Sequence, residues 1–524
     1  MRPTAVKRIL ALAGYLLGAG VVACSNDRLT SLNTNPNSPE DAPAGPVFTQ
    51  AITGTPTSLA LVLSSGAASR WLGVTSQTQL ELVAQHLAKT QYPDEDRYAR
   101  IQAGDTQNAF NGAYSGDLED LRQVIVKGRT AKAAAVYGPA MVMQAWEFAN
   151  LTDSWGDIPY SQSLAGDSSA HVFTPTYDRQ KDIYAGLFST LAQASTAMAT
   201  PSGATLGSAD PIYGGSAGKW MKLANSLHAR LALRVVNVDR STADAELRKA
   251  LAAPGGVFAS LDDQAQLTWP GDGIYDNPWA VNFKTRDDYR MSQTLMNILV
   301  PTNDPRTAVF AMPTVADPTK YAGMPNGLQA SVAGTYFNTA SRPGAIFYPG
   351  GTAYGVYGGG GGRQPSYLMT FAELLFIEAE AAERSLGGLV PAQARGFYEA
   401  GITASMQQWG VTDPSAIGRF LSQPAVAYQA GTAGLKQIAV QKWIALYTDG
   451  LQAWSEWRRT CQPSTIAAGP AAVVSYVPRR LYYPTSEAST NGASLSAAIA
   501  AQGPDNFSTR IYWDKNPAGA PTCG

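Results

Sequence analysis

The sequence predicts a mainly α-helical protein with long loop insertions and little β structure. Apolar side chains recur at helical spacing in several segments, whereas residues 261–303 and 314–364 are rich in Gly, Pro, Asp and Asn and lack this periodicity. Apolar residues make up 45% of the chain and charged residues 15%, which is enough to build a large core. We therefore expect one helical domain over residues 47–524, with the two loop-rich segments inserted into it.

The first 23 residues have the pattern of a bacterial lipoprotein signal peptide. Arg2, Lys7 and Arg8 form a basic start, and the apolar run that follows them, 9–22, is too short to span a membrane comfortably. Small residues then lead to Cys24, in an order that resembles a lipobox. We expect cleavage before Cys24 and acylation of this cysteine, so that lipid chains hold the protein to the membrane.

Residues 24–46 follow as a polar tether rich in Asn, Pro and Asp. Loss of the three basic residues of the leader changes the formal net charge from −1 to −4. The mature chain therefore lacks the positive charge that nucleic acid binding requires, and we expect no nucleic acid partner.

Helical stripes account for the middle of the chain. One stripe ends at Ala149, and Gly156 and Pro159 then mark the end of its helix and a polar, aromatic loop. Two further stripes predict helices that face the core. Their members are Tyr184, Leu187, Leu191 and Met198 in the first, and Trp220, Leu223, Leu227, Leu231, Arg234 and Val238 in the second.

A helical hairpin is predicted between residues 370 and 410. Thr370 and Glu373 form a capping-box pattern before an apolar run, and Gly387 and Gly388 end that run. A second helix follows Pro391. Further on, Trp443, Tyr447, Gly450, Trp454 and Trp457 are predicted to line one face of a long helix, mostly as core residues.

Several motifs occur in an order that resembles the SusD/RagB family of surface nutrient-binding lipoproteins. The strongest is LTDSWGDIPYS at 151–161. The others are at 32–39 (LNTNPNSP), 220, 224–227 (ANSL), 230–234 (RLALR), 368–380 (LMTFAELLFIEAE), 443–450 (WIALYTDG), 456–460 (EWRRT) and 479–487 (RRLYYPTSE). The resemblance implies a SusD-like helical fold with tetratricopeptide-like helix pairs. It also implies attachment to the outer membrane facing outward, a SusC-like TonB-dependent transporter as partner, and a glycan or oligosaccharide ligand, with peptides or other nutrients as the alternative.

The remaining cysteines predict a disulfide. With Cys24 assigned to lipid, Cys461 and Cys523 are an even pair in a chain that has crossed into an oxidising space. Their spacing does not suit a compact metal motif, and the chain contains only three His. The glycine-rich segment 348–362 lacks the ending of a phosphate-binding loop, so we expect neither a metal nor a cofactor.

Two other functions fit the sequence less well than nutrient binding does. A helical carbohydrate-active enzyme needs two carboxylates that flank the scissile bond, but Glu373 is explained by the helix cap, and Asp287 and Asp288 are adjacent. A helical scaffold that binds only protein would not require loops in which aromatic side chains alternate with Asp, Asn and Arg. The sequence therefore favours a binding protein over an enzyme.

The predicted ligand site lies on the loops, because flat aromatic rings beside planar polar groups suit sugar binding. The candidates are Trp279, Tyr289, Tyr275, Arg286, Tyr354, Tyr357 and Tyr92. For Trp279 the alternative is that the ring packs beneath its own loop.

Overall fold

Antiparallel helices dominate the computed structural model, which describes residues 42–54, 66–74, 79–101, 103–166, 171–356, 358–516 and 523. The chain divides into two units, residues 1–43 and 44–524, and only the second is described below. The signal peptide and Cys24 lie outside the described residues. The predicted fold class, mainly α-helical with little β structure, is confirmed.

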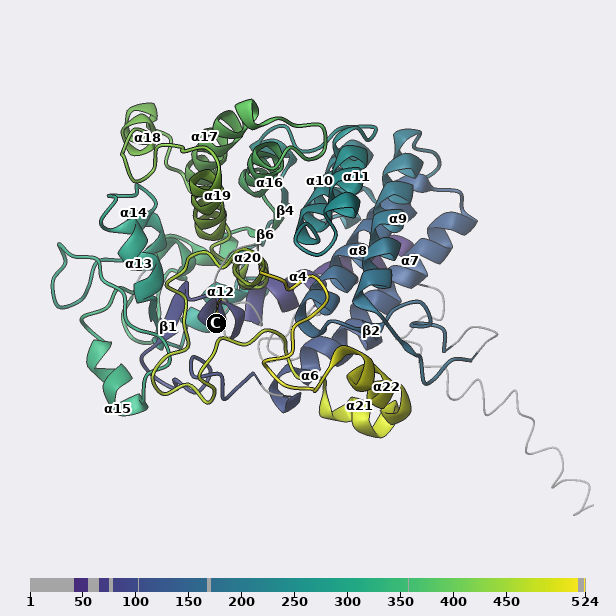
Figure 1. Ribbon diagram of the computed structural model, residues 1–524. Helices are drawn as coiled ribbons and strands as arrows, with labels where there is room; N and C mark the ends of the chain where they lie inside the picture. The colour runs from purple at the N-terminus through teal and green to yellow at the C-terminus, as the bar shows by residue number, and fades with distance from the viewer. Residues whose placement is uncertain are drawn as a thin grey trace, which may run out of the picture. The chain divides into compact units, whose positions relative to one another are not determined.

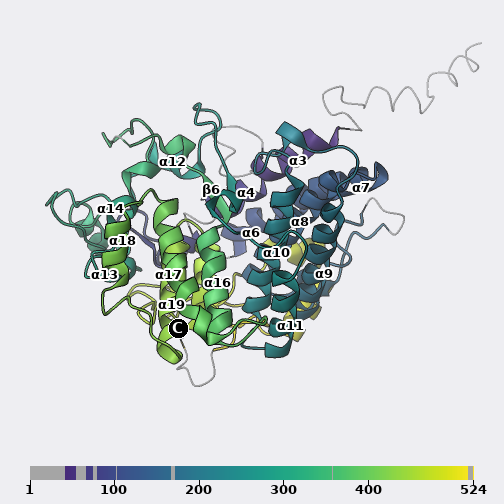
Figure 2. The same ribbon diagram turned by 90° about the horizontal axis from the view of Figure 1, so that it is seen from above.

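The longer helices pack mostly as sequential neighbours. They are α3 (Ala44–Thr53), α7 (Leu118–Thr130), α8 (Ala134–Trp155), α9 (Gln180–Ala199), α10 (Ala217–Arg234), α11 (Arg240–Leu251), α16 (Phe371–Glu383), α17 (Pro391–Gln408), α19 (Thr432–Ala445), α20 (Gly450–Thr460) and α22 (Gly492–Gln502). Helices α7 to α11 form one series of neighbours, and α16, α17 and α19 form a second group (Figure 1). The two groups meet where α16 packs beside α10, as Figure 2 shows.

Short helices and turns occupy the segments between these groups. They are α4 (Ala67–Ser69), η2 (Arg70–Val74), α5 (Glu81–Val83), α6 (Ala103–Gly112), η4 (Ala113–Asp117), η5 (Gly207–Ala209), η6 (Leu261–Asp263), α12 (Pro278–Phe283), α13 (Gln293–Leu299), α14 (Thr307–Phe310), α15 (Ala330–Ala333), η7 (Gly334–Tyr336), η8 (Ala345–Phe347), η9 (Gly361–Arg363), α18 (Pro414–Leu421) and α21 (Thr485–Thr490).

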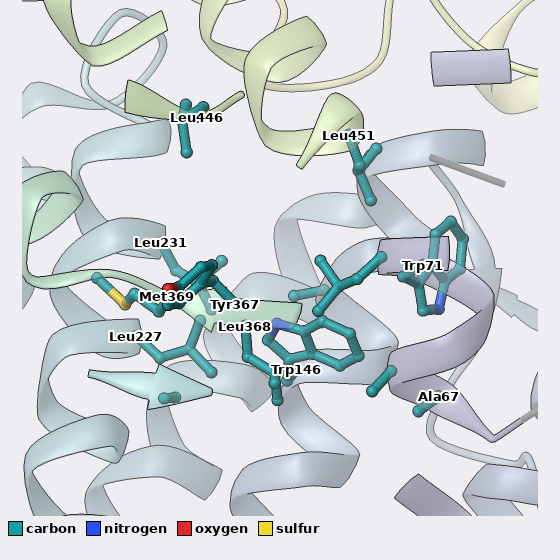
Figure 3. Packing of buried hydrophobic residues seen from close by; sticks show 14 of the residues in the cluster. Ala67, Trp71, Trp146, Leu227, Leu231, Tyr367, Leu368, Met369, Leu446 and Leu451 are labelled. Carbon is teal, nitrogen blue, oxygen red and sulfur yellow. The ribbon is translucent and has the colours of Figure 1, made fainter. Parts of the chain in front are cut away.

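Three short antiparallel strand pairs join segments that are distant in sequence. They are β1 (Leu87–Lys89) with β5 (Tyr289–Met291), β2 (Ile158–Pro159) with β3 (Tyr177–Asp178), and β4 (Ala265–Leu267) with β6 (Ser366–Met369). The first and third pairs attach the loop-rich insertion 261–303 to the rest of the domain. In the core, Trp146 of α8, Leu227 of α10 and Leu368 of β6 belong to one hydrophobic cluster (Figure 3).

The predicted cap of α16 is correct on one side only. Thr370 Oγ1 accepts a hydrogen bond from the backbone N–H of Glu373 at 3.1 Å, as an N-cap residue should. The Glu373 carboxylate does not return to the Thr370 backbone. It accepts instead from Arg230 of α10, with Nε to Oε1 at 2.7 Å. Charge explains this choice, because the buried guanidinium of Arg230 would be left without a counter-charge if the carboxylate turned back to the helix start.

The Trp-rich segment near the C-terminus is two helices, α19 and α20, rather than the one long helix expected from its spacing. Thr448, between them, has φ of 85°, and Asp449 caps α20 by accepting from the N–H of Gln452 at 3.2 Å. A Cβ at Gly450 would lie 2.5 Å from a backbone nitrogen of α5, so only glycine allows this close approach. The aromatic face is nevertheless buried as predicted, with Trp443, Tyr447, Trp454 and Trp457 in the core.

A buried carboxylate, Asp153, connects the two ends of the domain. One of its oxygens accepts from the Tyr184 hydroxyl at 2.6 Å and from Trp513 Nε1 at 2.7 Å, and the other accepts from Arg234 Nη1 at 3.1 Å. Its backbone oxygen accepts from Arg458 at 2.8 Å. All these side chains are buried. Asp153, the third residue of the segment 151–161, is therefore a structural junction.

The segment 151–161 also binds the C-terminal segment 479–487 directly. Trp155 Nε1 donates to the backbone oxygen of Tyr482 at 2.7 Å, and the Tyr483 hydroxyl donates to the backbone oxygen of Asp157 at 2.6 Å. The N–H of Leu481 donates to the oxygen of Ser154 at 2.9 Å. Two of the motifs recognised in the sequence are thus partners of each other in the fold.

Substitution of Asp153 tests this junction. Asp153→Ala leaves the Arg234 guanidinium buried without this carboxylate, so we expect a loss of about 3–5 kcal/mol in the free energy of unfolding. Urea denaturation followed by circular dichroism measures it. The control is Asp94→Ala, whose exposed carboxylate pairs with Arg97 at 3.2 Å and should contribute less than about 1 kcal/mol. Equal losses in the two variants would contradict the role given to Asp153.

The two remaining cysteines meet at the end of α20. Cys461 and Cys523 form a disulfide with Cα atoms 5.4 Å apart. The bond attaches the C-terminal tail beside Trp457 and Arg479, because Arg479 Nη1 also donates to the backbone oxygen of Cys523 at 3.2 Å.

Mass spectrometry of the non-reduced protein tests the disulfide in solution. A peptide joining Cys461 to Cys523 is expected, and two free thiols would contradict it. The bond closes a loop with a sequence separation of 62 residues. Loop-closure entropy then predicts that Cys523→Ser lowers the free energy of unfolding by up to about 4 kcal/mol.

Candidate functional site

The β1–β5 pair brings an early loop against the loop-rich insertion. Lys89 pairs with Tyr289, and the N–H of Thr90 donates to the oxygen of Asp288 at 2.8 Å. Continuing the same register places Tyr92 opposite Arg286. The Arg286 guanidinium indeed lies over the Tyr92 ring, 4.7 Å from its centroid. Two residues far apart in the sequence thus form one surface pair, which we call the Tyr92 platform.

The Tyr92 ring is exposed although the backbone beneath it is constrained. Its side chain is 65% exposed, which is unusual for a large aromatic residue. Its φ is 49°, in the left-handed region that non-glycine residues rarely adopt, and Tyr98 at the end of the same loop has φ of 65°. Strained backbone conformations of this kind are common at functional sites.

Arg286 is held in place by a carboxylate behind it. Its Nε donates to Asp288 Oδ2 at 2.8 Å, and Nη2 also donates to this oxygen. Burial alone would lower the pKa of Arg286, but the bonds to Asp288 outweigh it and raise the pKa. Lys89 lies behind the platform as well, where its Nζ pairs with Glu95 and lies 4.8 Å from the centroid of the Tyr289 ring. The guanidinium is therefore a fixed cation under the exposed ring.

Asp96 anchors the loop that carries Tyr92. Its carboxylate accepts from Asn326 Nδ2 at 2.7 Å, from the N–H of Gly327 at 3.1 Å and from the N–H of Lys89 at 3.3 Å. Burial raises the pKa of Asp96 to about 7, although these three hydrogen bonds act to lower it. The loop is thus attached to β1 and to residues 326–327 of the second loop-rich segment.

Trp279 and Tyr289 are not available to a ligand in this structure, which corrects two of the predicted contacts. Both are 2% exposed. Trp279 is at the start of α12, where it packs against Phe347 and Tyr447, and its Nε1 donates to the backbone oxygen of Leu72 at 3.2 Å. Trp279 therefore packs in the core beneath its own loop, which is the alternative stated for it from the sequence. Tyr289 is inward-facing because β5 is a buried strand, and it supports the platform from below.

Tyr354 and Tyr275 lie at different places on the loop-rich region. Tyr354 is half-buried, and its hydroxyl donates to the oxygen of Phe283 at 2.7 Å, close in sequence to Arg286. Tyr275 is 38% exposed and lines a cavity of about 540 Å³ with Trp269 and part of α3. Among the described contacts none joins Tyr275 to Tyr92. Tyr357 lies outside the described residues.

Sequence reasoning missed the residues that position the platform. The sequence presents Asp288 only as half of an adjacent acidic pair, and it gives no local signal for Lys89 or Glu95. A signal existed in the register of β1 and β5, but a pairing of three residues between distant segments leaves no local periodicity to read.

The described ranges contain neither a metal-binding cluster nor a membrane-spanning helix. There, no cluster of three or more His, Cys, Asp or Glu side chains is placed to hold a metal ion. The helices of this part of the chain also do not include one with both the length and the hydrophobicity needed to cross a membrane.

Comparison with known proteins identifies the family. Residues 47–484 match the SusD-like family, which is described as starch-binding and associating with the outer membrane. The chain belongs to the SusD-like family. The resemblance seen in the sequence is therefore confirmed, and with it the expectation of a binding protein rather than an enzyme. No curated protein sequence matches this SusD-like chain.

Solved structures agree with the fold of this SusD-like protein. A chitin-binding SusD homolog from Flavobacterium johnsoniae is 24% identical with a TM-score of 0.74, covering 91% of this chain and 98% of that one. A SusD homolog from Bacteroides vulgatus is 23% identical with a TM-score of 0.73, covering 91% and 98%. One from Bacteroides fragilis is 21% identical with a TM-score of 0.73, covering 90% and 100%. At these identities the similarity concerns the fold alone.

Proposed function

We propose that this SusD-like protein captures a glycan or oligosaccharide at the cell surface and delivers it to a SusC-like TonB-dependent transporter. The observation that carries the proposal is the Tyr92 platform, in which an exposed ring is fixed on Arg286. The chitin-binding homolog and the starch-binding description of the family support the ligand class.

The platform has the chemistry of a sugar-stacking surface. One face of the Tyr92 ring lies against the guanidinium, and the other is free to take the C–H face of a pyranose ring. Nearby carboxylates, Asp94 and Glu95, can accept hydrogen bonds from sugar hydroxyls. Because Arg286 is already bound to Asp288, the ring does not have to be ordered when a ligand arrives, which reduces the entropy cost of binding.

Replacing Tyr92 tests the platform. Tyr92→Ala should weaken binding of the recognised oligosaccharide by about 1–3 kcal/mol, or roughly 5- to 150-fold in Kd, because one stacked aromatic anchor is lost. Stability should change little, since the ring is 65% exposed. Isothermal titration calorimetry against malto-, chito-, cello- and xylo-oligosaccharides, with a mixed peptide library alongside, measures the effect.

Two control variants make this experiment specific. Tyr137→Ala removes another tyrosine that lies under an arginine, with the Arg129 guanidinium 5.9 Å from its centroid on the helical series, and should leave affinity unchanged. Trp279→Ala should cost about 3–5 kcal/mol of stability, as expected for a buried Trp. Unchanged affinity in Tyr92→Ala would remove the platform from the site, and binding of peptides alone would replace the sugar by a peptide.

The proposal places the protein on the outer membrane, facing outward and anchored through acylated Cys24. The motivation is the basic, apolar and small-residue order of the leader, which ends at Cys24. One acyl chain gives only marginal binding, so durable attachment depends on several chains on the same residue.

Membrane partition tests the anchor. In a host that processes lipoproteins, the unmodified protein should sediment with membranes and incorporate labelled palmitate, whereas Cys24→Ser should do neither. Cys461→Ser is the matched cysteine control and should still partition with membranes. Equal partition of the unmodified protein and Cys24→Ser would refute lipidation at this residue.

A further inference from the structure

A second cavity lies away from the Tyr92 platform, between α6, the loop that follows β2, and α21. Its volume is about 670 Å³, within the range of small-molecule sites. Helices α6 and α21 are neighbours in the lower part of Figure 1. A side-chain bond joins them at the cavity, because Asn111 Nδ2 donates to Ser486 Oγ at 3.1 Å. The cavity therefore has walls from three separate segments of the chain.

Aromatic rings form part of these walls. Phe110 and Tyr114 are tilted against each other with centroids 5.0 Å apart. The Tyr114 hydroxyl donates to the oxygen of Pro159 at 2.6 Å, which fixes the orientation of its ring. Phe173, from the loop after β2, also lines the cavity and is 75% exposed, the largest exposed fraction among the large hydrophobic side chains of the described residues. These rings offer flat apolar surface to a ligand.

A buried side-chain amide on the cavity wall is a second indication of a ligand, independent of the aromatic rings. Asn491, at the junction of α21 and α22, lines the cavity and is only 5% exposed. Its Nδ2 donates to the oxygen of Pro175 at 2.9 Å, whereas its Oδ1 accepts no hydrogen bond from the described residues. A buried acceptor without a donor is unfavourable, so a ligand that brings a donor to it recovers free energy.

The charges around the cavity restrict the ligand further. Glu119 and Glu487 are the charged members of its described lining, which includes no Lys or Arg. Glu487 Oε2 accepts from the Tyr177 hydroxyl at 2.6 Å, so this carboxylate is held in position. Acceptors beside apolar rings suit a ligand that has several hydroxyl donors and an apolar face, and they repel anions.

We propose that this cavity is an additional binding site for a neutral sugar residue. The ring C–H face packs against Phe173 and Tyr114, and hydroxyls donate to the Glu487 carboxylate and, after the amide turns toward the cavity, to Asn491 Oδ1. Glu487 disfavours uronic acids and sulfated sugars, whereas Glu119 is already paired with Arg122 at 2.7 Å. The proposal shares a ligand class with the Tyr92 platform but rests on different residues, so either site can fail without the other.

Hydrogen–deuterium exchange of the whole mature chain separates the two sites. Maltohexaose, chitohexaose, cellohexaose and xylohexaose serve as neutral probes, and oligogalacturonate serves as the acidic one. We expect a neutral probe to slow exchange at residues 106–115 and 485–492, including in the Tyr92→Ala variant. Slowing confined to residues 90–98 and 284–291 would overturn the cavity and retain the platform. Slowing confined to residues 106–115 and 485–492 would overturn the platform and retain the cavity. No slowing at either place would overturn both sites.

Affinity measurements in the Tyr92→Ala background complete the test. Phe173→Ala should weaken the residual binding roughly 5- to 150-fold while leaving the melting temperature unchanged, because the side chain is mostly exposed. Asn491→Ala should weaken it as well, which shows that the effect is not confined to one exposed ring. Equal residual affinity in Tyr92→Ala and in its two double variants, with Phe173→Ala or with Asn491→Ala, would overturn the proposal. Binding of oligogalacturonate in preference to the neutral probes would also overturn it.

Discussion

The Asp153 carboxylate is the constraint on which the helical part of the structure depends. It is buried and accepts hydrogen bonds from α9, from α10 and from the segment that contains Trp513. Removing one partner of a buried charge is strongly destabilising, so this carboxylate fixes the three segments relative to one another. Around it, Glu456 pairs with Lys442 at 3.1 Å, and Arg459 joins Glu456 to Glu380 of α16. The same network therefore connects the two helix groups.

The loop-rich part depends on a much smaller element. Three residues of β1 and three of β5 would not form a stable pair alone in water. They are held because Asp96 binds β1 and residues 326–327, and because Tyr289 is buried. This register, once fixed, determines that Tyr92 meets Arg286. The geometry of the platform is thus set by the β1–β5 pair, and this pair is stabilised by side chains at its edges.

Local sequence patterns correctly predicted the features that depend on interactions between residues close in sequence. The helical stripes, the Thr370 cap and the buried Trp residues of α19 and α20 follow from spacing and side-chain chemistry alone. The break at Thr448 did not, because its cause is a backbone of α5 that approaches Gly450 from a distant part of the chain. Trp279 was misplaced for a similar reason: its sequence neighbours are those of a polar loop, whereas its spatial neighbours, Phe347 and Tyr447, make it a core residue.

The residues that identify the family and those proposed to meet ligands are different sets. Asp153 and Trp155 are buried and satisfied within the protein, and changing either would leave donors or acceptors without partners. Tyr92 and Phe173 are mostly exposed, and exposed side chains can usually change at little cost to folding. The scaffold can therefore keep its motifs while the exposed rings vary with the ligand. It follows that the motifs report the fold, and that the residues which select a ligand have to be sought in the loops that surround them.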